Sequence, residues 1–146
     1  MTTAVLDTNV LVSAFVGVTN SHSVPGQLLR AWLLGVFHLV VSAHILDEVT
    51  RTLAKPYFRR RLTLTQIVAA HSLLTRRAVL AQITVRVQRV AAHPEDDLIL
   101  ATALSANADF LVTGDEQLQR LGSYQGVQIV GPRAFLAVLG NKGRPT

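Results

Sequence analysis

The sequence predicts an α/β fold, a three-layer α/β/α sandwich built on a central parallel sheet of four to five strands. Short apolar, β-branched runs alternate along the chain with segments of helical periodicity, which is typical of a parallel sheet with crossover helices. Hydrophobic residues make up 49% of the 146 residues, enough for a sizeable core in one domain. We therefore expect a single domain over residues 1–139 and a flexible tail over residues 140–146.

The strands are predicted from their composition and length. The first run is apolar or β-branched throughout, as a strand buried on both faces requires, whereas the third alternates apolar and polar residues. The strands are expected over residues 3–6, 37–42, 83–87, 110–113 and 127–130.

The helices are predicted from apolar residues that recur every three or four positions. Pro25 and Pro94 fit the first turn of a helix, while Gly35 and Pro56 fit positions just past a helix end. The helices are expected over residues 8–15, 25–34, 43–53, 64–80, 94–107, 117–121 and 132–139. A short basic connector, residues 57–61, is expected to join two of them.

The composition narrows the classes of function. Fourteen Lys and Arg against nine Asp and Glu give a formal net charge of +5, which favours a polyanionic partner. Cysteine is absent, so disulfides and thiolate metal sites are excluded. The apolar runs are too short for a membrane span, and the start of the chain lacks the pattern of a signal peptide. We expect a cytoplasmic protein without a membrane partner.

Four of the acids stand beside apolar runs. Asp7 closes the first strand, Asp115 follows the fourth, Asp97 begins the helix before the fourth, and Glu48 lies on the helix after the second. At about 100° per residue, Glu48 flanks the buried stripe of its helix while Asp47 points away. Ligands of open parallel sheets bind at the carboxyl ends of the strands. Four carboxylates gathered there would repel one another unless Mg²⁺ or Mn²⁺, which prefer oxygen ligands, neutralised them.

Each acid also has a simpler interpretation. Asp7 could cap the helix that follows it, Asp97 could serve the helix dipole as its neighbours do, and Asp115 could be a turn residue. Glu48 alone would be an ordinary helix acid. The metal-site prediction therefore depends on the four acids together.

Four segments carry a resemblance to a known family. They are residues 6–11 (LDTNVL), 42–48 (SAHILDE), 97–103 (DLILATA) and 108–115 (ADFLVTGD). In this order, they resemble the four motifs of PIN domains, the nuclease fold of VapC-type toxins, and the resemblance extends from Val5 to about Pro132. The Thr113-Gly114-Asp115 ending is most similar to the subgroup of PIN-type toxin components.

The resemblance implies a metal-dependent endoribonuclease that is the toxin of a toxin–antitoxin pair. The catalytic and metal-binding residues that it implies are Asp7, Glu48, Asp97 and Asp115, with Asn9 and Thr113 as supporting groups that orient Asp7 or water. Asp96, adjacent to Asp97, leaves the register of the third motif open. We choose Asp97 because it aligns with the Leu-Ile-x-Ala pattern that follows. The implied cofactor is Mg²⁺ or Mn²⁺, and the implied partners are an RNA substrate and a cognate antitoxin.

Two surface features suggest where partners bind. Basic clusters could follow a nucleic-acid backbone, or they could be solvated surface. These clusters are Arg59, Arg60, Arg61, Arg76 and Arg77. Apolar residues outside a single helical stripe, among them Leu73, Val79 and Leu80, favour a homodimer face or an antitoxin groove, with a role in the core as the alternative.

Two other functions compete with the nuclease. A non-catalytic nucleic-acid-binding or regulatory PIN domain would keep the fold without the chemistry, but all four acids are present here. A phosphatase of the haloacid-dehalogenase type shares Thr113-Gly114-Asp115. Such enzymes need a second Asp two residues after the nucleophile, where this chain has Asn9, and their lysine motif is missing.

Overall fold

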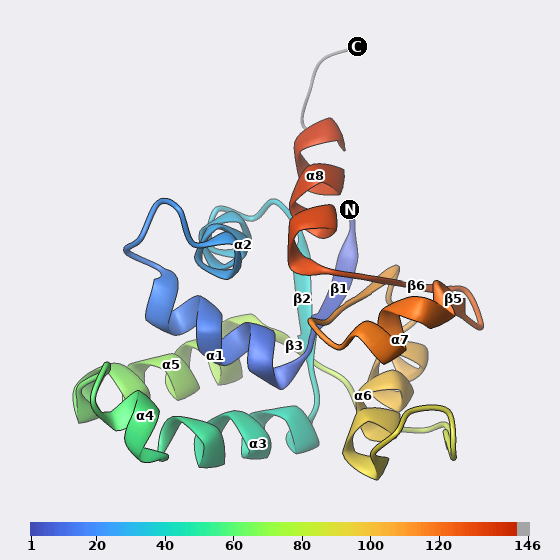
Figure 1. Ribbon diagram of the computed structural model, residues 1–146, viewed down its shortest axis with the longest axis horizontal. Helices are drawn as coiled ribbons and strands as arrows, with labels where there is room; N and C mark the ends of the chain where they lie inside the picture. Colours follow the sequence, from blue (N-terminus) through green and yellow to red (C-terminus); the bar gives the residue numbers. More distant parts are fainter. Residues whose placement is uncertain (143–146) are drawn as a thin grey trace.

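A six-stranded sheet forms the centre of the computed structural model, which describes residues 1–142 (Figure 1). Its order is β3-β2-β1-β4-β6-β5, and all neighbours are parallel except the β5–β6 hairpin. The strands are β1 (Thr3–Leu6), β2 (His38–Val41), β3 (Val79–Leu80), β4 (Phe110–Val112), β5 (Ser123–Tyr124) and β6 (Val127–Val130). The predicted α/β class is confirmed, with one strand more than the four to five expected.

Helices cover both faces of the sheet. They are α1 (Thr8–Gly17), α2 (Val24–Leu33), α3 (Ala43–Leu53), α4 (Pro56–Arg59), α5 (Leu64–Arg77), α6 (Pro94–Ser105), α7 (Glu116–Leu121) and α8 (Pro132–Lys142). In Figure 1, α1 to α5 lie on one side of the sheet and α6 and α7 on the other, which gives the three predicted layers. None of the described helices is long and apolar enough to cross a membrane.

The two central strands, β1 and β4, are almost entirely buried. Val5 of β1 and Leu111 of β4 are fully buried and lie beside each other in the parallel register. β1 is apolar and buried from Ala4 to Leu6, as suits a strand with helices on both faces. At the other end of the sheet, Phe135 of α8 packs edge-on against Phe37 with ring centroids 5.2 Å apart. The pairing of Leu6 with Val112, and a bond from the Asp7 N–H to the Val112 carbonyl at 2.9 Å, hold the carboxyl ends of β1 and β4 side by side.

The prediction of a strand over residues 83–87 is wrong. The third strand is Val79–Leu80, which pairs with Val40 and Val41 of β2, so α5 ends at Arg77 instead of residue 80. The N–H groups of Thr84 and Val85 donate to Ser105 Oγ at 2.9 and 3.4 Å instead of to a neighbouring strand. The alternating residues therefore belong to a loop that lies along α6.

Two smaller differences concern helix boundaries. The expected connector over residues 57–61 begins as one helical turn, α4, which Pro56 starts. α8 continues to Lys142, past residue 140 where the tail was expected to begin. Residues 143–146 of that predicted tail lie outside the described part of the chain.

Candidate active site

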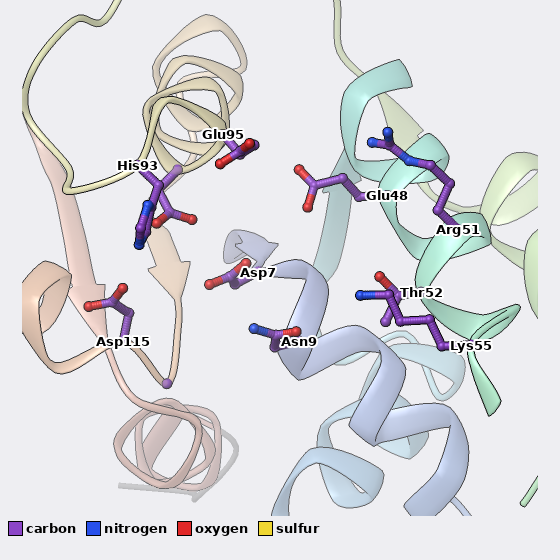
Figure 2. Close-up of a pocket in the computed structure, with 11 residues that line it drawn as sticks. Asp7, Asn9, Glu48, Arg51, Thr52, Lys55, His93, Glu95 and Asp115 are labelled. Atoms are coloured by element: carbon purple, nitrogen blue, oxygen red, sulfur yellow. The ribbon is translucent and has the colours of Figure 1, made fainter. Parts of the chain in front are cut away.

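A pocket of ≈ 800 Å³ opens at the carboxyl edge of the sheet, where β1 and β4 end (Figure 2). Such an edge is where open parallel sheets bind ligands. The pocket is lined by Asp7, Asn9, Glu48, Arg51, Thr52, Lys55, His93, Glu95, Asp96, Gly114 and Asp115. Three of the four predicted acids are therefore brought together, and Asp97 is not among them.

Asp7 is the acid most firmly held in place. Thr113 Oγ1 donates to Asp7 Oδ2 at 2.8 Å and accepts from the backbone N–H of Asp115 at 3.0 Å. Thr113 is fully buried, and the Asp7 residue is 7% exposed. Asp7 is the N-cap residue of α1 and makes no side-chain capping hydrogen bond, although the backbone N–H groups of Thr8 and Asn9 act to lower its pKa. One buried hydroxyl thus connects two pocket acids across neighbouring strands.

Asp115 both caps a helix and lines the pocket. Its Oδ1 accepts from the backbone N–H groups of Gln117 at 2.8 Å and Leu118 at 3.2 Å, which caps the start of α7. The same carboxylate lines the pocket across from Glu48. The cap fixes the orientation of the carboxylate, because two N–H donors define the position of Oδ1.

Glu48 faces the pocket from α3, as its place on the flank of the buried stripe predicts. Its Oε1 contacts His44 Nε2 one turn earlier, and both atoms are buried with no other polar partner among the described residues. The start of α3 is tied to α6 because Ser42 Oγ accepts from Thr102 Oγ1 at 2.9 Å. Asp47 instead pairs with Arg51 at 3.5 Å on the solvent side.

Asp97 turns away from the pocket and organises a loop. Its carboxylate accepts three backbone N–H groups, from Arg89 at 3.0 Å, Val90 at 3.2 Å and Ala91 at 2.7 Å. Arg89 has φ +58°, an unfavourable conformation for a residue with a side chain, and its bond to Asp97 helps to hold it there. Asp97 instead borders a second cavity, beside this loop. We correct the sequence assignment accordingly, since Asp96 is the aspartate that lines the pocket.

The carboxyl groups of the pocket repel one another. Burial, together with the negative charges of Asp7, Asp115 and Glu48, raises the pKa of Asp96 to about 6, although His93 acts in the opposite direction. Burial is also the main cause that raises the pKa of Asp7, against the lowering effect of the Thr113 hydroxyl. Charged carboxylates at this edge are therefore costly without a neutralising cation.

The donor set suits a hard divalent cation. Among residues 1–142, no three His, Asp or Glu side chains lie close enough together to hold an ion in this arrangement. The acids of the pocket offer oxygen atoms only, which Mg²⁺ and Mn²⁺ prefer, and their mutual repulsion is relieved when a cation binds. Asp7, Glu48, Asp96 and Asp115 would have to move closer together to hold one ion jointly.

The arginines expected to bind nucleic acid lie outside the pocket. They are Arg59, Arg60, Arg61, Arg76 and Arg77. Arg61 lies over the Tyr57 ring, with its Cζ 3.5 Å from the ring centroid, and Arg77 donates to the Leu33 carbonyl at 3.3 Å, at the end of α2. Sequence reasoning missed the basic residues that do line the pocket, Arg51 and Lys55. Their spacing of three and seven residues from Glu48 is the signal that could have found them.

Comparisons with known proteins agree with this fold. The family model described as PIN domain matches residues 3–117, which is most of the chain. The crystal structure of VapBC2 from Rickettsia felis bound to a DNA fragment from their promoter is similar in fold, with a TM-score of 0.59 and 16% sequence identity. That likeness covers 88% of this chain and 98% of the other. No match was found among the curated proteins.

Proposed function

The chain belongs to the PIN domain family, and we propose that it is a metal-dependent endoribonuclease and the toxin of a toxin–antitoxin pair. The observation that carries the proposal is the convergence of Asp7, Glu48, Asp96 and Asp115 on one pocket at the carboxyl edge of the sheet. The basic charge of the whole chain, +5, supports a polyanionic substrate for this acidic pocket.

The four acids would hold Mg²⁺ or Mn²⁺, which supplies an activated water and stabilises the charge that develops on the phosphate. Asp7 is the fixed member of the set, because the buried Thr113 hydroxyl holds one of its oxygens. Asp115 is fixed by its capping bonds, and Glu48 by its contact with His44. Asn9 lies beside Asp7 in Figure 2 and offers an amide that can orient water or a phosphate oxygen.

A test of cleavage separates this proposal from a PIN domain that only binds nucleic acid. Purified protein is incubated with RNA, with EDTA, Mg²⁺ or Mn²⁺, alongside Asp7→Asn and Glu116→Gln. Glu116 is an exposed acid that does not line the pocket, so its variant makes the same change of charge outside the site. We expect wild type and Glu116→Gln to cleave RNA only with metal, and Asp7→Asn to lose at least about 100-fold in rate. Equal cleavage by Asp7→Asn and wild type would exclude this site as the nuclease centre.

Two apolar surfaces support the proposed protein partners. Leu73 lines a groove of ≈ 230 Å³ with Phe15, Leu29 and Leu33, which suits an apolar segment of an antitoxin. Val79 and Leu80 are 50% and 61% exposed on the short edge strand β3, where a second copy of the chain could pair. Native mass spectrometry of the protein expressed with and without the neighbouring reading frame would show which partner is bound.

A further inference from the structure

Helix α3 lines the pocket with a single polar stripe of mixed charge. Glu48, Arg51, Thr52 and Lys55 lie at positions i, i+3, i+4 and i+7, which is one face of an α-helix. Lys55 ends this stripe two residues past the end of α3, as the N-cap residue of α4. Figure 2 shows Glu48 near the acids and Lys55 extending toward Asn9 at the opposite end of the stripe. The pocket therefore has an acidic part and a basic part, and the same helix contributes to both.

The basic part does not serve to neutralise the acids. The Lys55 ammonium forms no ion pair or hydrogen bond with any residue in the described part of the chain. Arg51 forms an ion pair within residues 1–142 only with Asp47, at 3.5 Å, and both side chains are about two-thirds exposed. Such an exposed pair contributes little and is easily exchanged for a stronger partner. Both cations are thus available to an anion that enters the pocket.

We propose that Lys55, assisted by Arg51, binds a backbone phosphate of the RNA strand adjacent to the phosphate that is hydrolysed. This inference rests on the proposed function, because it takes RNA as the substrate. At a rise of about 1.5 Å per residue, α3 extends about 8 Å from Glu48 to its last residue, and Lys55 lies two residues farther, which allows the two to contact different phosphates of one strand. Thr52, between them on the stripe, adds a hydroxyl donor.

The arginine cluster that follows α3 is less suited to this role. Arg59, Arg60 and Arg61 do not line the pocket, and Arg61 is already engaged by the ring and the carbonyl of Tyr57. Arg60 is exposed, and its side chain forms no hydrogen bond or ion pair with another described residue. It therefore provides a matched control for Lys55, with the same loss of charge a few residues away.

The experiment measures binding without cleavage. Lys55→Gln, Lys55→Arg and Arg60→Gln are each made in an Asp7→Asn background, and fluorescence anisotropy follows a short single-stranded RNA with Mg²⁺ over a range of salt concentrations. We expect Lys55→Gln to bind about 3- to 10-fold more weakly and to reduce the slope of log K against log salt by about 0.7, the value for one lost contact with a single strand. Lys55→Arg should keep most of the affinity, and Arg60→Gln should match its parent.

A second measurement distinguishes an effect of Lys55→Gln on RNA binding from an effect on the rate of hydrolysis. In the otherwise wild-type protein, Lys55→Gln should raise KM several-fold and change kcat little, because the contact is made before and during the reaction alike. All the variants should melt at the temperature of their parents, since Lys55 and Arg60 are exposed.

The outcomes separate this inference from the proposed function. If wild type cleaves RNA while Lys55→Gln and Arg60→Gln have the same affinity and salt slope, the phosphate contact is refuted and the nuclease stands. If binding depends on Lys55 but no cleavage occurs with either metal, the phosphate contact stands and the nuclease is refuted. Absence of RNA binding by the protein would overturn the phosphate contact.

Discussion

The first turn of α6 carries two neighbouring aspartates in opposite environments. On one side, Asp97 accepts three backbone N–H groups from residues 89–91, and its charge is fully matched by hydrogen bonds. On the other side, Asp96 faces Asp7, Glu48 and Asp115, and burial with these like charges raises its pKa to about 6. The two carboxylates belong to consecutive residues, so the sequence around them is nearly the same.

The contrast separates structure from function in physical terms. A carboxylate satisfied by N–H donors lowers the free energy of the fold, while one held near other carboxylates raises it unless a ligand intervenes. An acid that costs stability without a compensating contact within the protein indicates a binding site. Substitutions at the two positions should therefore have opposite consequences, which three measurements can test.

The largest effect is expected on catalysis at Asp96. Asp96→Asn removes one of the four charges that would hold the cation, and RNA cleavage should fall by at least about 100-fold. Asp97→Asn, assayed at a temperature where it is folded, should stay within about 10-fold of wild type because it does not line the pocket. Single-turnover rates with Mn²⁺ measure both. The reverse ranking would restore Asp97 to the site.

The next effect is on stability at Asp97. Asp97→Ala leaves the N–H groups of Arg89, Val90 and Ala91 without their acceptor, and we expect a loss of about 2–3 kcal/mol in the free energy of unfolding. Urea denaturation measures the loss, and limited proteolysis within residues 82–92 should become faster. A variant as stable as wild type, with an intact loop, would contradict the structural role of Asp97.

The smallest effect is the pH dependence that Asp96 gives to the metal-free protein. Its pKa is higher in the folded state than the ordinary 3.8, so the folded state binds the proton more tightly. The stability contribution is therefore full below about pH 4 and is lost as the pH rises to about 6, by about 1 kcal/mol once solvent screening is allowed for. In EDTA, raising the pH from about 4 to about 6 should lower the free energy of unfolding of wild type by about 1 kcal/mol more than that of Asp96→Asn. Urea denaturation of both proteins at the two pH values measures the difference. Parallel pH profiles for the two proteins would show that Asp96 is not perturbed.

Much of the fold could be predicted because its signals are local. The apolar run of β1, the Ser42 cap of α3 and Pro94 at the start of α6 each specify an element within a few residues. The strand expected over residues 83–87 failed for a reason that is not local. Its alternating residues lie along α6, and Ser105, some twenty positions away, accepts the N–H groups of Thr84 and Val85.

The site could be predicted less completely for the same reason. Asp7, Glu48 and Asp115 follow from their places at strand ends and on a helix flank, and they do line the pocket. Helical periodicity could not choose between Asp96 and Asp97, because both precede buried residues at three and four positions. The choice depends on the loop over residues 89–91, whose N–H groups needed an acceptor, and no sequence pattern marks that need.

The stripe on α3 has a geometric consequence. The intrahelical hydrogen bonds of α3, and a bond from the Lys55 N–H to the Thr52 carbonyl at 3.1 Å just past the helix end, set the separation between Glu48 and Lys55 and keep it constant. An RNA strand whose phosphate is bound at Lys55 therefore meets the pocket acids at a constant distance from that phosphate, whatever its bases are. Inserting a single residue between Glu48 and Lys55 would turn Lys55 about 100° around the helix axis. The phosphate contact would then be lost, while every pocket acid kept its position.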